Sequence, residues 1–210
     1  MIRVITIERE YGTGGSDIAA GLAQTLGWRL IDQCLIDEVA QLARINHQLA
    51  ERCDERIDPW YHRLGKAFWQ GSIDRITALR NSEVFDSERM VQLASQVIEH
   101  AADTGECVIV GRGAACQLSK RADAFHVFLY GSHKHRARYL RERYPERGDL
   151  VEQDMESNDR RRAAYMRTFF KQEWNAPKLY HMMLNTCMGQ DGVIDTILTA
   201  THLQRVNHAA

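Results

Sequence analysis

Three glycines and a serine hydroxyl lie within five positions close to the beginning of the chain, in the run Gly12-Thr13-Gly14-Gly15-Ser16. Glycines let the backbone turn sharply and leave space for a ligand to approach the main chain. An apolar, β-branched run over residues 2–8 precedes them, and an amphipathic segment over residues 14–27 follows. A strand, a tight loop and a helix in this order aim the first helical amides at an anion, most often phosphate. The alternative is an ordinary turn that needs glycine for its geometry alone.

The phosphate loop of nucleotide-binding enzymes reads G-x-x-x-x-G-K-[ST], and this chain fits that pattern only in part. Gly14 and Ser16 match the second glycine and the hydroxyl, whereas Arg9 stands at the first glycine and Gly15 at the lysine. Arginine stays charged at any relevant pH and holds phosphate through a bidentate fork, so Arg9 is the best candidate to replace the charge of the lysine. Ser16 is the predicted Mg²⁺ ligand. The predicted phosphate-binding segment consists of Gly12, Thr13, Gly14, Gly15, Ser16 and Asp17.

Apolar strands alternate with amphipathic helices along the rest of the chain. Strands are predicted over residues 28–32, 107–110, 126–130 and 181–186, and helices over residues 35–50, 87–102 and 190–203. This alternation is typical of a parallel sheet covered on both faces. Ligands bind such sheets at the carboxyl ends of the strands. Because Asp32 and Arg112 stand at the ends of two predicted strands, we expect them at the same rim as the glycine loop.

Two segments depart from the alternating pattern. Residues 51–80 hold four aromatic side chains among many charges, and we interpret them as a helical insertion that either covers a site or packs against the body. Residues 131–171 hold 11 basic against 7 acidic residues. Most of these charges are expected on a solvated face, but a basic helical hairpin can also form a lid that closes over a nucleotide. In such a lid, Arg160 or Arg162 is predicted to approach the phosphates.

The composition is that of a single globular domain over residues 1–210. A net charge of −1 gives no reason to expect nucleic acid or an anionic membrane as a partner. The five cysteines form no CxxC pair, which suits a reducing compartment rather than a disulfide framework or a zinc site. The chain shows neither an apolar run of 18 residues nor a signal-peptide pattern. We therefore expect a cytoplasmic protein without a membrane span, and both a monomer and a homodimer stay open.

The order of these pieces resembles the nucleoside monophosphate kinases, and most closely the cytidylate kinase-like branch of that P-loop family. The run Arg-Glu-Tyr-Gly-x-Gly-Gly at residues 9–15 resembles the signature of this branch. Further correspondence covers residues 26–32, 108–113, 128–136 and 159–162. The resemblance implies a three-layer α/β/α fold with a central parallel sheet, a helical insertion and a helical lid. It also implies ATP-dependent phosphoryl transfer between nucleotides, assisted by Mg²⁺.

The sequence departs from cytidylate kinases at positions that bind the substrates. The loop lysine is replaced by Gly15, and the acidic residues that flank the Gly-Arg pair after the central strand are replaced by Val110 and Gly113. Cytidylate kinases recognise the monophosphate with a serine, a tyrosine and an arginine that follow an aspartate equivalent to Asp32. At those positions this chain has Gln33, Asp37 and Glu38. The resemblance therefore transfers the fold but not CMP as the substrate.

Three functions remain open on the sequence. The first is a kinase with an altered loop, which transfers phosphate from ATP to a nucleotide or another small acceptor. The second is a nucleotide-binding protein or sensor without turnover, and the third is a P-loop protein that binds another anion or a partner. For the kinase, ATP and Mg²⁺ are the expected cofactors, and Glu8 and Asp32 are placed to orient the metal or to accept a proton. The candidate catalytic residues are Arg9, Asp32, Arg112, Arg160 and Arg162.

We predict that the protein is an inefficient CMP kinase. A monophosphate carries close to two negative charges, and Asp37 and Glu38 would repel it by about 1 kcal/mol per pair at ~4 Å even in water. Steady-state assays with CMP, dCMP, UMP and AMP test this, and we expect a kcat/KM for CMP below about 10⁴ M⁻¹s⁻¹. A higher value would show that other residues hold the acceptor, for which the basic residues of segment 51–80 are available.

Overall fold

The computed structural model describes residues 1–32 and 84–206, with side chains for all of these except residues 84–90. The helix predicted over residues 35–50 and the insertion predicted over residues 51–80 lie outside the described residues. Five strands form one sheet in which all neighbours are parallel. In spatial order they are β2 (Arg29–Ile31), β3 (Cys107–Val110), β1 (Val4–Arg9), β4 (Ala124–Tyr130) and β5 (Met182–Asn185).

The central strand β1 is buried along its whole length. It pairs with β3 on one side and β4 on the other, so that Thr6 lies between Ile109 and His126. A strand covered on both faces reads as a continuous apolar run rather than an alternating one, and this explains the β-branched sequence that leads to Arg9. The same register brings the last residues of β1, β3 and β4 to one rim of the sheet.

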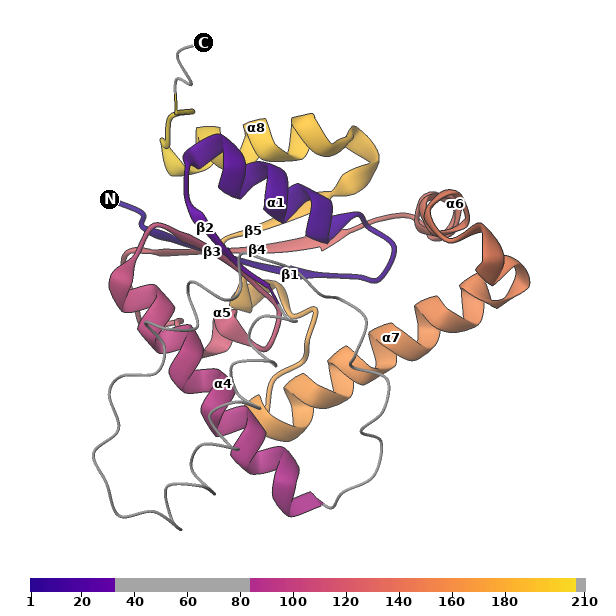
Figure 1. Ribbon diagram of the computed structural model, residues 1–210, viewed down its shortest axis with the longest axis horizontal. Helices are drawn as coiled ribbons and strands as arrows, with labels where there is room; N and C mark the ends of the chain where they lie inside the picture. The colour runs from indigo at the N-terminus through magenta and orange to yellow at the C-terminus, as the bar shows by residue number, and fades with distance from the viewer. Residues whose placement is uncertain (33–83, 207–210) are drawn as a thin grey trace, which may run out of the picture.

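Helices cover both faces of the sheet (Figure 1). Helices α1 (Gly15–Leu26) and α8 (Gln190–Thr201) pack on one face, where Leu22 and Ile197 join a core with Ile5 and Val127. Helices α4 (Val84–Thr104) and α5 (Ala114–Gln117) pack on the other face. The expected three-layer α/β/α fold is confirmed. None of the helices in the described ranges 1–32 and 84–206 is both long enough and apolar enough to cross a membrane.

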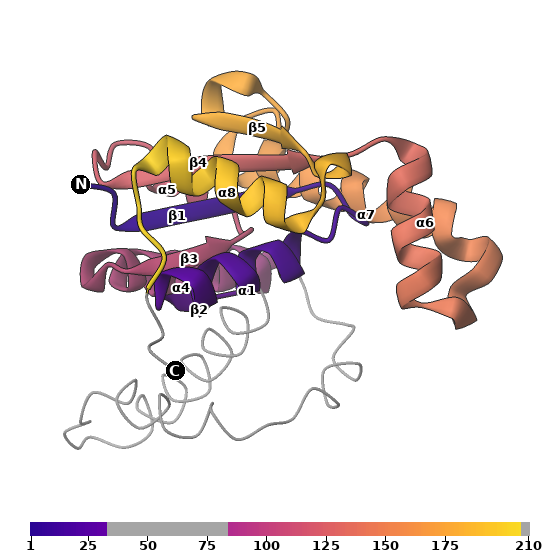
Figure 2. The same ribbon diagram turned by 90° about the horizontal axis from the view of Figure 1, so that it is seen from above.

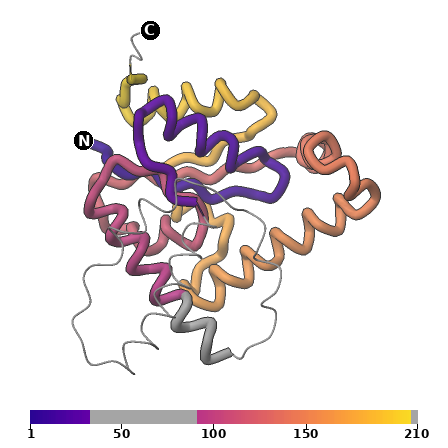
Figure 3. Tube along the Cα trace, in the orientation of Figure 1, coloured from indigo at the N-terminus to yellow at the C-terminus, as the bar shows by residue number. Residues whose placement is uncertain are grey.

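The basic segment of residues 131–171 is largely helical. Its first helix lies beyond the carboxyl ends of the strands, and its second runs back along the face of the sheet that carries α4 and α5 (Figures 1 and 2). The segment comprises α6 (His133–Arg143), the 3₁₀ turn η3 (Pro145–Leu150), α7 (Val151–Tyr165) and the π-helical turn η4 (Met166–Phe170). The chain leaves β4, passes through α6, turns back along α7 and then returns to β5 through η5 (Pro177–Leu179), as Figure 3 traces. After β5, the turn η6 (Thr186–Met188) leads into α8. A small apolar cluster of Ala137, Leu140, Val151 and Met155 holds α6 against α7. Movement of this segment as a lid stays a prediction.

The boundaries of the elements follow from local signals in the sequence. Helix α1 ends at Gly27, which adopts the left-handed conformation (φ 67°) and lets the Trp28 amide donate to the carbonyl of Ala23. Glycine makes such a helix end possible without steric cost. Where the predicted strands and helices fall on described residues, their ends agree with the observed ones to within three residues, which is the scale on which helix and strand ends fray.

His126 makes the stability of the fold depend on pH. Its ring is buried in β4, with Nδ1 2.8 Å from Thr6 Oγ1 and the ring stacked on His181 at 4.9 Å. Burial, together with the neighbouring His181, lowers the pKa of His126 from 6.5 to about 4. The folded protein therefore keeps this imidazole neutral at pH values at which the unfolded chain protonates it. Stability is lost as the pH falls from about 6.5 towards 4.

We predict that this loss reaches about 3 kcal/mol, since each pKa unit corresponds to about 1.36 kcal/mol. Urea unfolding at pH 7, 5.5 and 4.5 measures it, and His126→Gln removes the titrating ring. The free energy of unfolding of the variant is expected to fall less steeply with decreasing pH than that of the natural chain. Identical slopes for the two proteins would exclude His126 as the source of the pH dependence.

Candidate functional site

The glycine loop connects β1 to the beginning of α1. Gly12 and Gly14 have φ values of 84° and 69°, which are strained for any residue with a Cβ. Gly14 precedes the first helical residue, and among the described residues no side chain caps its amides. Ser16 is exposed in the first helical turn, followed by Asp17. Uncapped amides at a helix N-terminus, beside a hydroxyl, are the elements of a phosphate site.

The far side of the loop packs against α6. A Cβ at Gly12 would lie 2.8 Å from Leu140 Cδ1 and 2.9 Å from the carbonyl oxygen of Arg136. A Cβ at Gly14 would lie 3.3 Å from the ring of Tyr139, whose hydroxyl donates to Asp17 at 2.7 Å. The close approach of α6 excludes a side chain at position 12 and leaves little space at position 14, and the backbone conformation favours glycine at both. This contact between the loop and α6 was not predicted from the sequence.

Gly15, at the position of the missing lysine, packs against Arg9. A Cβ at Gly15 would lie 2.8 Å from Arg9 Cγ and 3.0 Å from Arg9 Cβ. The buried side chain of Arg9 thus fills the space through which a side chain at position 15 would leave the loop. The two departures from the phosphate-loop pattern are consequently complementary in space: the cation is carried by the first position of the motif instead of the seventh.

Arg9 opens into a cavity of about 390 Å³ at the carboxyl ends of β1 and β3, which we call the arginine cavity. Four arginines from three parts of the chain contribute to its wall, and Glu8 contributes a carboxylate. A cavity with this balance of charge favours an anionic ligand. The residues that line it are Glu8, Arg9, Gly111, Arg112, Asn158, Arg161, Arg162, Tyr165, Met166 and Trp174.

Arg162 ties α7 to the end of β1. Its Nη1 donates to the carbonyl oxygen of Arg9 at 2.7 Å, and its Cζ lies 5.7 Å from the centre of the Tyr11 ring. Burial, together with the like charge of Arg9, lowers the pKa of Arg162 to about 10. The guanidinium is still protonated at neutral pH, so two adjacent cations face the arginine cavity. A bound phosphate would relieve their mutual repulsion.

Glu8 is buried and held in place by two donors. Its Oε1 accepts the amide of Gly113 at 3.1 Å, and its Oε2 accepts Trp174 Nε1 at 3.3 Å. Among the described residues that line the arginine cavity, in the ranges 1–32 and 84–206, Glu8 is the one acidic side chain. A fixed carboxylate opposite several arginines can accept a proton from a substrate hydroxyl or a hydrogen bond from a water.

A second charged cluster joins the loop to both helices of the basic segment. Arg136 Nη1 lies 2.8 Å from Glu10 Oε2 and 2.9 Å from Asp159 Oδ2. Asp159 Oδ1 accepts the amide of Tyr11 at 2.8 Å, and burial raises the pKa of this carboxyl. We refer to Glu10, Arg136 and Asp159 as the clamp. Asp159 lies in the run of residues 159–162 that resembles the family, but no pattern in the sequence linked it with Arg136 or Glu10.

The structure brings together some of the predicted catalytic residues and separates others. Arg9, Arg112 and Arg162 line one cavity. Arg160 lies 3.4 Å from Glu156 with 76% of its side chain exposed, on the outer face of α7. Asp32 follows β2, with β3 between it and β1, and the residues that line the arginine cavity do not include it. Arg161 lines the cavity, although the sequence analysis did not select it.

The parallel sheet, the loop between β1 and α1 and the helical segment beyond the strand ends define the class of this protein as the P-loop kinase fold. The model of the cytidylate kinase-like family matches residues 4–187, and the chain belongs to this family. The resemblance found in the sequence is therefore confirmed, together with the general phosphotransferase character of the family.

Solved structures show the same fold at low sequence identity. An uncharacterized protein from Eubacterium ventriosum superposes with a TM-score of 0.70 at 20% identity, over 96% of this chain and 99% of that chain. A shikimate kinase from Bacteroides thetaiotaomicron superposes with a TM-score of 0.52 at 15% identity, over 97% of this chain and 100% of that chain.

Curated relatives match over shorter stretches. The cytidylate kinase of Edwardsiella ictaluri is 31% identical over 84 residues, which are 40% of this chain and 37% of that protein. The cytidylate kinase of Serratia proteamaculans is 38% identical over 56 residues, which are 27% of this chain and 24% of that protein. In these matches the chain spans well under half the length of its curated relatives.

The packing of Arg9 on Gly15 predicts a non-additive pair of substitutions. Gly15→Lys alone places a side chain against Arg9 and is expected to destabilise the fold by about 1–3 kcal/mol. Arg9→Gly with Gly15→Lys turns residues 9–16 into the full G-x-x-x-x-G-K-S pattern and removes the clash. Melting temperatures of the four proteins in this cycle measure the coupling. Simple additivity would show that the two positions do not compete for one space.

Proposed function

We propose that this protein transfers a phosphoryl group from ATP, with Mg²⁺, to a small acceptor, and that Arg9 supplies the charge of the missing loop lysine. The observation that carries this proposal is the packing of the Arg9 side chain over Gly15, together with its exit into the arginine cavity. Phosphoryl transfer requires in-line positioning and positive charge around the transferred group more than covalent help from the protein. Arg9, Arg112 and Arg162 supply that charge at the rim of the sheet.

The donor set of the loop fits a nucleotide phosphate. The uncapped amides at the beginning of α1 suit phosphate oxygens, and the predicted binding segment of residues 12–17 contains these amides. Mg²⁺ usually binds one or two protein ligands together with substrate phosphates, and the exposed hydroxyl of Ser16 is placed for that role. When bound, the metal would neutralise charge on the transferred group. Over the described ranges, no three His, Cys, Asp or Glu side chains cluster as a metal site.

Glu8 and Asp32, which stand at the carboxyl ends of two strands, are the candidates to receive a proton from the acceptor. Glu8 faces the arginines from the end of β1 and is held by Gly113 and Trp174, so it is the stronger candidate to receive a proton. Asp32 is the weaker candidate, since it lies beyond β3. From the basic segment, Arg162 and Arg161 contribute charge at the cavity, whereas Arg160 would require a rotation of α7 to reach it.

A nucleotide sensor without turnover is the second candidate function. It is favoured by the contact of α6 with the loop, in which Tyr139 covers Gly14 and donates to Asp17 in the first turn of α1. ATP, as the phosphate donor, would have to share this region with Tyr139 if it bound the amides at the beginning of α1. Screening ATP consumption with Mg²⁺ against nucleoside monophosphates and small alcohols separates the two functions. A kinase shows turnover that depends on the acceptor, whereas a sensor binds ATP without it.

We predict that Arg9→Ala weakens binding of Mg·ATP by about 1.5–3 kcal/mol, the contribution typical of a hydrogen bond to a charged group. Arg160→Ala is the control, because it removes an exposed arginine that does not line the arginine cavity, and it is expected to leave the affinity unchanged. Isothermal titration calorimetry measures both. Unchanged affinity in Arg9→Ala, with a lowered melting temperature, would assign Arg9 a purely structural role.

A further inference from the structure

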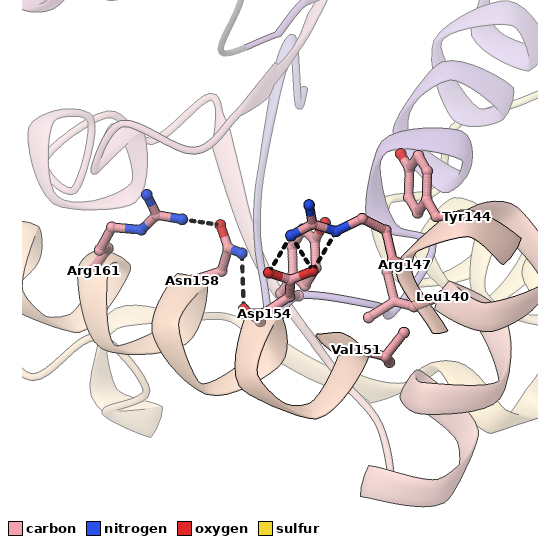
Figure 4. A pocket seen from close by; sticks show the side chains of 8 residues that line it. Leu140, Tyr144, Arg147, Val151, Asp154, Asn158 and Arg161 are labelled. Atoms are coloured by element: carbon pink, nitrogen blue, oxygen red, sulfur yellow. Dashed lines mark hydrogen bonds and ion pairs between the residues drawn. The ribbon is translucent and has the colours of Figure 1, made fainter. Parts of the chain in front are cut away.

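The wall that α7 contributes to the arginine cavity is held by bonds within the helix. Arg161 Nη2 donates to Asn158 Oδ1 at 3.0 Å, and Asn158 Nδ2 donates to the carbonyl oxygen of Asp154 at 2.8 Å (Figure 4). Asn158 and Arg161 line the arginine cavity and also a second cavity of about 400 Å³, which Figure 4 shows from close by. The cation of Arg161 is therefore supported by α7 itself, whereas Glu8, near the end of β1, takes its support from elsewhere in the chain.

Residues 171–181, which we call the strap, connect η4 with β5. The strap ends at His181, whose amide donates to the carbonyl oxygen of His126 in β4 at 2.8 Å. Near its beginning, the strap is joined to η4 by Arg167, which donates from Nε and Nη2 to Glu173 at 3.3 and 3.0 Å. The strap is thus attached to η4 at one end and to β4 at the other.

Trp174 is a buried residue of the strap, with 6% of its surface exposed. Its indole ring packs edge-on against Phe128 of β4, with the ring centroids 5.3 Å apart. The hydroxyl of Tyr180 donates to the carbonyl oxygen of Trp174 at 2.5 Å, and Met166 of η4 belongs to the same apolar cluster. Because β4, η4 and the end of the strap all hold this residue, its indole N–H has a fixed direction.

The indole N–H of Trp174 is directed at Glu8. Each oxygen of the Glu8 carboxylate accepts one donor: Oε2 accepts the indole at 3.3 Å, and Oε1 accepts the amide of Gly113 at 3.1 Å. A carboxylate with a donor on each oxygen cannot rotate without breaking a hydrogen bond, because such bonds weaken steeply when they are misaligned. The amide of Gly113 belongs to the backbone, at a position where a Cβ would collide with the ring of Phe170. Trp174 is thus the side chain that fixes the plane of this carboxylate.

We propose that Trp174 is a positioning residue: its indole N–H holds the Glu8 carboxylate in the orientation in which Glu8 takes the proton of the acceptor. In that step the O–H bond of the acceptor breaks and its proton passes to Glu8. The acceptor oxygen forms a bond to the γ-phosphorus of ATP, and the bond from this phosphorus to the bridging oxygen breaks, so that ADP leaves. The inference rests on the proposed function, because it takes Glu8 as the proton acceptor. It adds a residue of the strap on which that proton transfer depends.

The hydrogen bond between Trp174 and Glu8 is tested by nuclear magnetic resonance of the full chain, isotopically labelled at its tryptophan nitrogens. Trp174→Phe removes one indole N–H resonance and thereby assigns it. We expect Glu8→Gln to move the proton of this resonance upfield, because a hydrogen bond to a neutral amide oxygen is weaker than one to a carboxylate. Trp28 is not among the described residues that line the arginine cavity, and its resonance, assigned by Trp28→Phe, should stay in place.

Steady-state kinetics test the positioning itself, with an acceptor taken from the screen of ATP consumption. Trp174→Phe keeps an aromatic ring and removes the N–H, and we expect kcat to fall by about tenfold while the KM for Mg·ATP changes by less than about twofold. In a chain that already carries Glu8→Gln, we expect Trp174→Phe to change kcat by less than about twofold, since the indole acts only through Glu8. Trp28→Phe makes the same exchange away from the cavity and should alter neither constant.

The outcomes separate this inference from the proposed function. If the Trp174 resonance does not respond to Glu8→Gln, or if Trp174→Phe lowers kcat equally in the natural chain and in the Glu8→Gln chain, Trp174 acts through the fold. The inference is then overturned while the proposed function stands. A rise in the KM for Mg·ATP that accounts for the whole loss of activity would overturn it in the same way. If no acceptor of the screen supports turnover by the natural chain, the proposed function fails and the inference fails with it.

Discussion

The burial of Arg9 at the carboxyl end of the central strand is the constraint on which the rest of the site depends. Removing a guanidinium from water costs several kcal/mol unless neighbouring groups compensate for it. The side chain of Arg9 has room only because position 15 is glycine. The backbone carbonyl of Arg9 accepts a hydrogen bond from Arg162. The repulsion between these two arginines is part of what lowers the pKa of Arg162. Four arginines and one glutamate are among the described residues that line the arginine cavity, and the proposed function takes this cavity as the site of an anion.

The clamp connects the loop beside the arginine cavity with helices α6 and α7. Arg136 lies between Glu10 of the loop and Asp159 of α7, and Asp159 also accepts the amide of Tyr11. A change in the position of α7 would therefore alter the loop backbone and the placement of Arg162 together. The position of α7 is therefore connected through the loop backbone and Arg162 with the arginine cavity. The clamp also explains why α6 approaches so closely that Gly12 tolerates no side chain.

Membership of the cytidylate kinase-like family accounts for the fold. Within that frame, residues 9–16 contain one cation, as the standard phosphate loop does, but at its first position instead of its seventh. Electrostatics explains why such a change is tolerable: a phosphate responds to the position of the charge and its hydrogen-bond geometry, whichever position of the loop supplies the side chain.

The sequence by itself determined the layers of the fold and most of the element boundaries, because strand and helix periodicities and glycine signals such as Gly27 are local. It also predicted that Arg9, the glycine loop and Arg112 lie at one rim of the sheet, because the carboxyl ends of parallel strands meet at the same edge. Only the tertiary structure decided that Arg161 and Arg162, and not Arg160, face the cavity, because a difference of one residue turns a helical side chain by about 100°. The pairs Glu10–Arg136 of the clamp and Asp17–Tyr139 likewise join residues more than a hundred positions apart. No local pattern encodes such pairs; the docking of α6 on the loop creates them.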